Sequence, residues 1–523
     1  MKKALVLLLC AIVIVLFLST FNTETEGYIP TGDGLHSQGQ SQPTSSSRQP
    51  VSEQSLTLVY YPNKPLNPYQ TGDYTNRVLF PLLYQGLFST DDDYTPVPIL
   101  CKSYTRSKNM RVYTFYIEDA TFADGTALTA EDVAASLNAA RVSPAYQGRL
   151  RYVEDIRVGE DDSVIVSLSI SYENLPLLLD IPIVKASDVE AAQPMGTGPY
   201  YLEERRTGLQ LTRRKDWWCN ATLSVTASYI PLVEAQSNAQ IRDQYEYGNI
   251  DLVCTDPGSD LSVDFRSDYE LWSCENGIFL YLACNEKSQV FSDPALRLAL
   301  THAIDRDQLI EDFYRGFATA ATLPASPHSP FYNRSLAAKY TYDPEVFREA
   351  VALIPPPEPN EDGTEPAPVT VTILVNKTDS RRVRVARAIA QMLMDCGLKA
   401  TTSELSGKDY TTALSKGRYD LHLGQTTLSP NMDLSAFYAA DGALNFGGLL
   451  DTVIYEMCQE AMANTGNYYT LHRLVMEDAM LCPILFRSYA IYTSRGTFAE
   501  LDAVRDNLFF YTLGKTLEDV YMP

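Results

Sequence analysis

The sequence is poor in histidine and tryptophan, with five histidines and three tryptophans in 523 residues. None of the histidines forms the H-E-x-x-H motif of a zinc protease, and none of the nine cysteines lies in a C-x-x-C pair. A G-x-S-x-G nucleophile elbow and a phosphate-binding P-loop are also missing. From these absences we expect no metal site and no cofactor. An enzyme would have to act without any of these catalytic motifs.

Positive charge is also in short supply, because 42 Lys and Arg residues face 65 Asp and Glu residues, for a net charge of −23. Such a surface repels phosphate backbones and anionic lipids, so we expect no nucleic-acid partner. The hydrophobic fraction of 45% and the charged fraction of 20% are those of an ordinary globular protein. A chain of 523 residues exceeds what one core supports, and two or more lobes are expected.

The N-terminus carries two lysines followed by an apolar run over residues 4–18, which is the order of an export signal. The run is short for a membrane span of about twenty residues. Residues 1–20 are therefore interpreted as an export signal or an N-terminal anchor, and Leu9 ahead of Cys10 argues against lipidation. Residues 21–55 are polar and predict a disordered tether. The folded body is expected outside the cell membrane, either tethered to it or in the periplasm.

Eight of the nine cysteines lie beyond the apolar run, where an exported location permits disulfides. Their spacing does not reveal a pairing. Buried free thiols and one or two structural bridges both remain open.

Local patterns predict several helices and a parallel sheet. Thr129 precedes a helix with acidic residues in its first turn, as an N-cap should. Over residues 291–316 the sequence predicts one long helix with Asp293 as its cap and Gly316 at its end. Residues 369–424 alternate strand, helix, strand, helix and strand, which calls for parallel strands with right-handed crossovers.

Two closely spaced glycines, Gly196 and Gly198, stand in the segment Met-Gly-Thr-Gly-Pro-Tyr-Tyr. A dinucleotide-binding loop needs a third glycine and a helix, but Tyr201 holds that place and strand-like sequence follows. A tight turn is predicted instead, with glycine supplying unusual backbone angles and Pro199 fixing one dihedral angle.

Several segments, taken in order, resemble the extracellular solute-binding proteins of the dipeptide, oligopeptide and nickel class, which serve ABC importers. The resemblance runs from about Leu56 to the end of the chain. Its pieces are LNPY, ADGTALTAEDV, GTGPY, YGNIDLV, the helix that carries IDR, and YDLHLG. Each piece alone could be ordinary structure, so the resemblance rests on the order of the pieces along the chain.

The resemblance implies an α/β fold of the two-lobed periplasmic-binding-protein type (type II, class C-like), with mixed sheets and an interlobe cleft. Residues 56–282 with 490–523 would form lobe I, including a subdomain near 90–175. Residues 283–489 would form lobe II. A ligand held by both lobes would stabilise the closed form by hinge closure, and Asn285 is expected at the hinge beside the first crossing.

The resemblance also suggests ligand-binding residues. Peptide-binding members carry a Trp and then an Asp after the strand that matches YDLHLG, and the Asp pairs with the amino terminus of the peptide. In this chain Gln425 takes the place of the Trp and Leu428 that of the Asp, which predicts a ligand other than a standard free-amine dipeptide. Asp433 could substitute after a loop shift, or it could be a helix cap or a surface carboxylate. The other candidates are Asn67, Tyr200, Tyr201, Thr426 and Thr427, and core packing is the alternative for both tyrosines.

The function implied is that of the substrate-binding protein of an ABC importer. Its partners would be a small-molecule or oligopeptide ligand and ABC permease subunits with cytoplasmic ATPases, and the protein would be a monomer. Nickel is a ligand of some family members, but five scattered histidines give it little support. The alternatives are a ligand sensor or folding helper on the same fold, and an exported hydrolase.

Overall fold

The structure is a computed structural model that describes residues 54–70, 73–258, 265–355 and 369–523. The chain divides into two units, Met1–Ser52 and Glu53–Pro523, and the described residues belong to the second, which is compact. The predicted signal at 1–20 and nearly all of the predicted tether at 21–55 lie outside them. Across the described ranges, no helix combines the length and the apolar character that crossing a membrane requires.

Three sheets lie in the N-terminal part of the second unit. One has the strand order β1-β10-β9-β8, with β1 parallel to β10. Another is antiparallel with the order β4-β5-β7-β6, and β2 pairs with β3. Their strands are β1 (Leu58–Tyr60), β2 (Phe88–Thr90), β3 (Pro96–Pro98), β4 (Cys101–Arg106), β5 (Val112–Ile117), β6 (Val153–Val158), β7 (Val164–Leu168), β8 (Tyr200–Arg205), β9 (Gly208–Arg213) and β10 (Tyr229–Glu234).

The fourth sheet has seven strands in the order β11-β17-β12-β16-β14-β15, and β13 pairs with β17. Its strands are β11 (Leu252–Thr255), β12 (Tyr269–Cys284), β13 (Ala318–Ala320), β14 (Val371–Asn376), β15 (Ala400–Leu405), β16 (Leu421–Thr427) and β17 (Leu481–Ser494). β14 is parallel to β15 and to β16, which confirms the parallel arrangement predicted for this segment.

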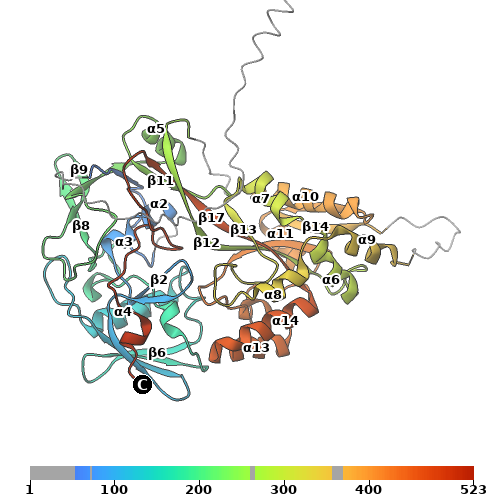
Figure 1. Ribbon diagram of the computed structural model, residues 1–523, viewed down its shortest axis with the longest axis horizontal. Coiled ribbons are helices and arrows are strands. Elements are labelled where there is room, and N and C mark those ends of the chain that lie inside the picture. The colour runs from blue at the N-terminus through green and yellow to red at the C-terminus, as the bar shows by residue number, and fades with distance from the viewer. Residues whose placement is uncertain (1–53, 71–72, 259–264, 356–368) are drawn as a thin grey trace, which may run out of the picture. The chain divides into compact units, whose positions relative to one another are not determined.

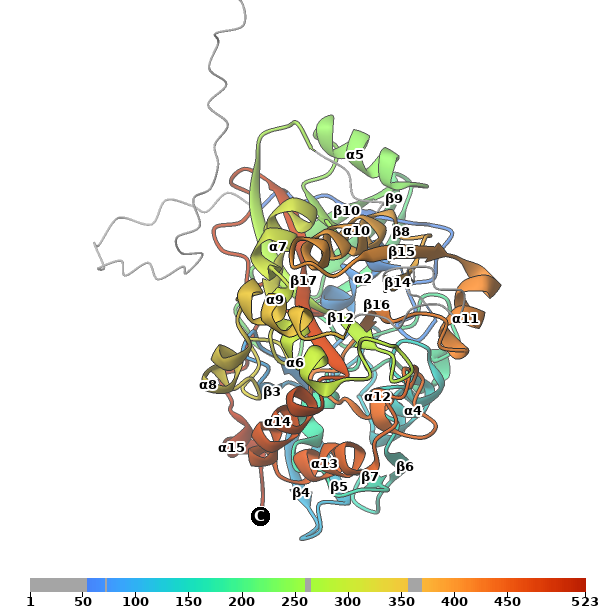
Figure 2. The same ribbon diagram turned by 90° about the vertical axis from the view of Figure 1, so that its right-hand side faces the viewer.

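The helices vary from one turn to about four turns in length. They are α2 (Tyr74–Arg77), α3 (Phe80–Leu83), α4 (Ala130–Val142), α5 (Asn238–Glu246), α6 (Pro294–Ala303), α7 (Arg306–Tyr314), α8 (Arg334–Ala337), α9 (Pro344–Ala352), α10 (Ser380–Asp395), α11 (Gly407–Ser415), α12 (Ser435–Tyr438), α13 (Thr452–Ala463), α14 (Tyr468–Asp478) and α15 (Leu517–Val520). Figure 2 shows α6, α7 and α9 in front of β17.

The predicted cap of α4 is confirmed, because Thr129 and Asp132 form a capping box. The prediction of one helix over residues 291–316 is wrong, since α6 ends at Ala303 and α7 starts at Arg306. The Asp305 side chain accepts a hydrogen bond from the Gln308 N–H and caps the second helix. A side chain that binds the backbone in this way favours a new helix start over continuation.

The glycine pair lies just before β8, where Gly196 forms a bridge with Val184 and the chain bends at Gly198, and the reason given for the glycines is wrong. Neither Gly196 nor Gly198 adopts a left-handed backbone conformation. A Cβ atom at either position would overlap the backbone of Leu83 instead. Glycine is needed here because this segment packs directly against α3.

The eight cysteines of the described residues are all free thiols, and six of them are buried. The interpretation as buried thiols therefore fits them better than that of disulfide bridges.

Two large hydrophobic clusters lie along the seven-stranded sheet. The first core is built mainly by residues 56–252 and 491–520, and the second core by residues 279–486. β12 and β17 pair with each other and contribute side chains to both cores. In Figure 1 the two strands run together between the two halves. The lobe boundaries at 282/283 and 489/490 stay predictions.

Candidate ligand-binding site

The predicted ligand residues of the 425–428 run lie on β16 and just after it. Gln425, Thr426 and Thr427 pair with Leu280, Phe279 and Ile278 of β12. The Gln425 side chain is half-buried, and its Oε1 accepts a hydrogen bond from Arg487 Nη1 at 3.1 Å. Thr427 is exposed. Gln425 is thus the residue of this run that reaches another functional group.

Leu428 and Asp433 are both engaged within the fold. Leu428 is buried in the second core, and its backbone N–H donates to Gly277 O at 3.1 Å. Asp433 accepts bonds from the backbone N–H and the hydroxyl of Ser435, at 2.8 and 2.5 Å. Burial raises the pKa of Asp433, although the bonds from Ser435 oppose this shift. Asp433 therefore binds the first residue of α12, but the N-cap position is Leu434, so Asp433 is not the helix cap considered as its alternative.

Asn67 and Tyr200 also have structural partners. The Asn67 amide donates to Val189 O and Ala191 O, and its oxygen accepts from the Tyr69 N–H. The Tyr200 hydroxyl donates to Ala227 O at 2.7 Å inside the first core. A ligand could reach either side chain only by displacing these bonds. Packing, the alternative considered for Tyr200, is what the structure shows.

Tyr201 and Asn285 are the remaining predicted residues. Tyr201 is half-buried on β8, opposite Thr212. Asn285 follows β12 directly, and its amide donates to Gly417 O and Tyr419 O at 2.8 and 2.6 Å. These bonds fix Asn285 to the segment ahead of β16. Its predicted hinge role is not tested by them.

Arg487 of β17 is the centre of the group to which Gln425 belongs. It is 4% exposed and forms an ion pair with Asp256, which directly follows β11. Its Nε atom has no hydrogen-bond partner among the described residues. Burial acts to lower the pKa of Arg487, but the neighbouring Asp256 carboxylate outweighs it and raises that pKa. The guanidinium group is therefore charged, buried and incompletely satisfied.

A cavity of about 690 Å³ adjoins this ion pair, and Asp256 is one of its lining residues. Tyr74 and Tyr489 line it as a stacked pair with their ring centroids 3.8 Å apart. The Cys254 thiol donates to the Tyr74 hydroxyl at 3.2 Å, and burial raises the pKa of that thiol. Small-molecule pockets measure about 300–1,000 Å³ and combine apolar walls with a few polar groups. This cavity is the candidate binding site, and its lining residue Asp256 connects it to Arg487 and, through Arg487, to Gln425.

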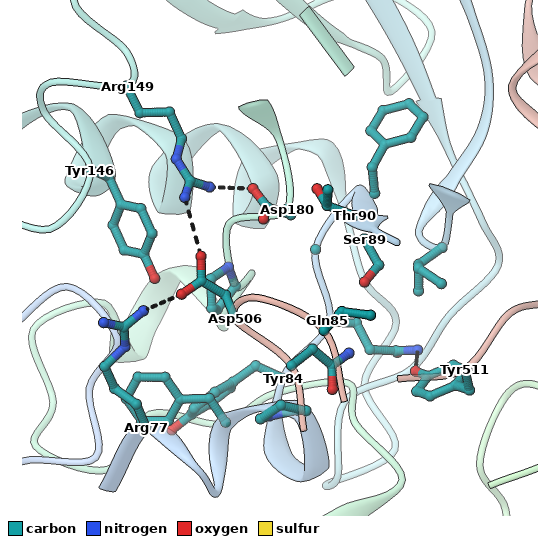
Figure 3. A pocket seen from close by; sticks show the side chains of 18 residues that line it. Arg77, Tyr84, Gln85, Ser89, Thr90, Tyr146, Arg149, Asp180, Asp506 and Tyr511 are labelled. Carbon is teal, nitrogen blue, oxygen red and sulfur yellow. Dashed lines mark hydrogen bonds and ion pairs between the residues drawn. The ribbon is translucent and has the colours of Figure 1, made fainter. Parts of the chain in front are cut away.

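A second, smaller cavity of about 80 Å³ lies in the N-terminal part of the unit (Figure 3). Asp506 binds Arg77 at 2.7 Å and Arg149 at 3.5 Å, and Arg149 also binds Asp180. These charges neutralise one another, and the space between them is too small for a peptide. The cluster is an anchor for the C-terminal segment that carries Asp506.

Sequence reasoning missed Arg487, Asp256, Tyr74 and Tyr489. A signal for Arg487 was present, because it is the single charged residue in the strand LCPILFRSYAIYTS. Its partner could not be foreseen, since Asp256 lies 231 positions earlier. Within the described ranges, no cluster of His, Cys, Asp and Glu side chains is suited to a metal ion.

Comparisons with known proteins agree with this architecture. The glutathione-binding protein GsiB of Salmonella typhi is 23% identical over 352 residues, covering 64% of this chain and 66% of the relative, which is just under two thirds of its length. The structure of NikA from Brucella suis in complex with Fe(III)-EDTA is 20% identical with a TM-score of 0.66, covering 87% of this chain and 98% of that one. The oligopeptide-binding protein AppA from Bacillus subtilis, in complex with a nonapeptide, is 18% identical with a TM-score of 0.59, covering 88% and 100%.

These structural likenesses establish the fold, which is mixed α/β and two-lobed. The profile of the bacterial extracellular solute-binding proteins, family 5, matches residues 95–447, well over half of the chain. This is a family of binding proteins. The chain belongs to the bacterial extracellular solute-binding proteins of family 5.

Proposed function

We propose that this protein is the substrate-binding protein of an ABC importer, which captures a peptide or similar small organic solute and delivers it to a membrane permease. The observation that carries the proposal is the cavity of about 690 Å³ beside Arg487, in a chain of this family. Tyr489 and Arg487 lie on β17, which contributes to both cores, and Gln425 lies on β16. A ligand in contact with these groups would stabilise the closed form of the hinge.

The ligand class is argued from the segment after β16, where the family pattern places the carboxylate for a peptide ammonium group, and from Asp256. Leu428 stands where peptide-binding relatives would have a carboxylate and is buried in the second core, while Asp433 binds Ser435. Asp256 is neutralised by Arg487. No unpaired carboxylate of the 425–433 run therefore faces a ligand ammonium group, which supports a ligand other than a standard free-amine dipeptide.

The remaining parts of the proposal follow the family. The protein would act on the extracytoplasmic side, tethered to the membrane or free in the periplasm, as a monomer that docks on permease subunits with cytoplasmic ATPases. A ligand sensor on the same fold is the second candidate. It shares the cavity and differs in having no permease partner.

Native mass spectrometry of the full chain tests the proposal. We expect an organic solute to co-purify, or an N-acetylated peptide from a defined mixture to bind more tightly than the same peptide with a free amine. Arg487→Gln should lower the occupancy, whereas Arg387→Gln, on the exposed face of α10, should leave it unchanged. Binding of none of these compounds, together with turnover of a substrate that depends on one carboxylate, would overturn the proposal in favour of the hydrolase.

A further inference from the structure

The tip between β2 and β3 holds Tyr94 in an unusual conformation. Its φ angle is 58°, in the left-handed region that bulky residues rarely adopt. The preceding Asp91 carboxylate supports the turn by accepting the N–H groups of Asp93 and Thr95, at 3.1 and 2.7 Å. Strained residues of this kind persist where the surrounding structure fixes them, and they cluster at switches and clamps.

The Tyr94 side chain packs in a different core from the residues around it in the sequence. Phe88 and Ile99, on either side of it in the chain, pack in the first core. Tyr94 is 3% exposed and packs in the second core instead. The turn therefore carries one aromatic ring from the part of the chain that builds the first core into the other core.

A single carboxylate receives this ring and a second segment. The Tyr94 hydroxyl donates to Glu275 Oε1, and the Ser326 hydroxyl donates to Glu275 Oε2 at 2.9 Å. Glu275 lies on β12 where its register with β17 shifts between Glu275 and Phe279. Ser326 is fully buried in the segment between β13 and α8. One side chain on a strand shared by the two cores thus joins three segments.

Arg505 reinforces the same place on β12. Gly277 has a φ angle of +71°, and a Cβ atom there would overlap the Arg505 guanidinium group. Arg505 donates to Leu428 O in the second half, while the adjacent Asp506 binds Arg77 and Arg149 in the first half. Figure 3 shows Asp506 between these two arginines. The C-terminal segment is therefore anchored on one side and reaches across to the other.

Polar and charged groups around Glu275 oppose the effect of its burial. Burial raises the pKa of Glu275, but the Tyr94 and Ser326 hydroxyls, His328 and Arg505 all favour the ionised form. Asp506 and Asp180 also lie near Arg505 and share its charge. The ionised carboxylate can accept both hydroxyls at once.

We propose that Tyr94, Glu275 and Ser326 form a latch that holds the two halves together at the irregular part of β12 and sets the fraction of closed protein before any ligand binds. The proposal rests on the hinge closure of the proposed function. A charge-assisted hydrogen bond is worth roughly a factor of ten or more in an equilibrium. Loss of the latch should lower the closed fraction by about that factor, and the apparent ligand affinity should fall in proportion.

Two hydrogen bonds outside the latch also join distant segments of the chain. The Glu173 N–H donates to Met462 O at 2.8 Å, and the Thr465 N–H donates to Glu173 Oε2 at 3.0 Å. Both bonds join the subdomain predicted near 90–175 to the α13 region. A purely local role of Tyr94 would leave them unchanged.

Hydrogen exchange of the full chain, followed by mass spectrometry without ligand, tests the latch. Tyr94→Phe and Ser326→Ala should speed exchange at Glu173 and Thr465 about tenfold, with β14 and β15 unchanged. Glu275→Gln, which keeps one acceptor oxygen, should show a smaller increase. Tyr60→Phe is the matched control, because the Tyr60 hydroxyl also binds a glutamate, Glu234, but within one sheet.

The outcomes separate the latch from the proposed function. Wild-type exchange at Glu173 and Thr465 in Tyr94→Phe, or the same increase in Tyr60→Phe, would overturn the latch. Addition of a mixture of N-acetylated peptides then tests closure itself. If these probes slow exchange at the two amides in the wild type, closure stands whatever the latch does. If a probe binds by native mass spectrometry and changes neither amide, both the closure and the latch are refuted.

Discussion

Arg306 binds a residue of β17, and Arg487 lies on β17. Both are 4% exposed, yet their surroundings differ. Arg306 Nε and Nη2 donate to Pro483 O at 3.1 and 2.9 Å, and its other bonds go to Ala321, Thr301 and Ile304. Arg487 binds Asp256 and Gln425, and its Nε has no partner among the described residues. The guanidinium group of Arg306 is therefore satisfied by the fold, whereas Arg487 has one nitrogen without such a partner and is paired with Asp256, which lines the cavity.

The pKa directions express the same difference. Burial lowers the pKa of Arg306, which has carbonyl and hydroxyl oxygens around it. For Arg487 the Asp256 carboxylate reverses the effect of burial. A buried arginine satisfied by neutral oxygens joins segments of the chain, and one paired with a carboxylate beside a cavity is a candidate for binding. Three variants, one of them double, test this distinction between a structural arginine and a binding arginine.

The largest effect is expected from Arg306→Met. The substitution keeps the volume but leaves the buried carbonyls of Pro483, Ala321 and Thr301 without donors. We expect the free energy of unfolding to fall by about 3 kcal/mol or more. Urea denaturation measures this as a lower midpoint with an unchanged slope. Solute occupancy of the protein that remains folded should equal that of the wild type, and a loss of binding without a loss of stability would remove the distinction.

A substitution at His472 tests whether a buried polar group without a hydrogen-bond partner is enough to identify a binding site. Neither of its ring nitrogens has a partner among the described residues, and it lies in α14 away from the lining of the candidate cavity. Burial lowers its pKa, and that of His422, to about 3. Because the folded pKa lies below the ordinary value of about 6.5, each neutral ring contributes stability above pH 6.5 that is lost as the pH falls.

Between pH 6.5 and 5 each of these histidines should cost about 2 kcal/mol of stability. His472→Leu should therefore halve the histidine-dependent loss over this range, with no change in solute occupancy. Urea midpoints measured across the range, with the partly exposed His302→Leu as the control, provide the measurement. An unchanged pH profile in His472→Leu would show that His472 is not neutral by burial.

Local features of the fold could be predicted because their causes lie within a few residues. Thr129 and Asp132 cap α4 within one turn, and Gly397 follows α10 with a φ angle of +92°. The break at Asp305 escaped prediction, because the apolar spacing continues through it while one side chain starts a new helix. The glycine pair was noticed for the wrong reason, since Leu83, which makes glycine necessary, lies more than a hundred positions away.

The candidate site was predicted less well, because its groups meet only in the folded chain. Gln425 was named from the family pattern, and it does reach Arg487. Leu428 and Asp433 were named from the same run, but β16 ends at Thr427 and the chain turns them toward the core and α12. Alignment to the family pattern predicts which segment forms the strand. The direction of each side chain after it depends on where that strand ends.

The smallest effect on stability, and the most direct contrast with Arg306, is expected from the double variant Arg487→Gln with Asp256→Asn. Both charges leave together, so neither is left buried and unpaired, and the free energy of unfolding should change by about 1 kcal/mol or less. Solute occupancy by native mass spectrometry should fall by about tenfold or more, since the ion pair formed by the cavity-lining Asp256 is gone. Asp256→Asn alone should cost more stability than the double variant, because it leaves the Arg487 charge uncompensated. If the double variant were as unstable as Arg306→Met and still bound solute normally, Arg487 would be a second structural arginine, and the cavity would need another group to recognise its ligand.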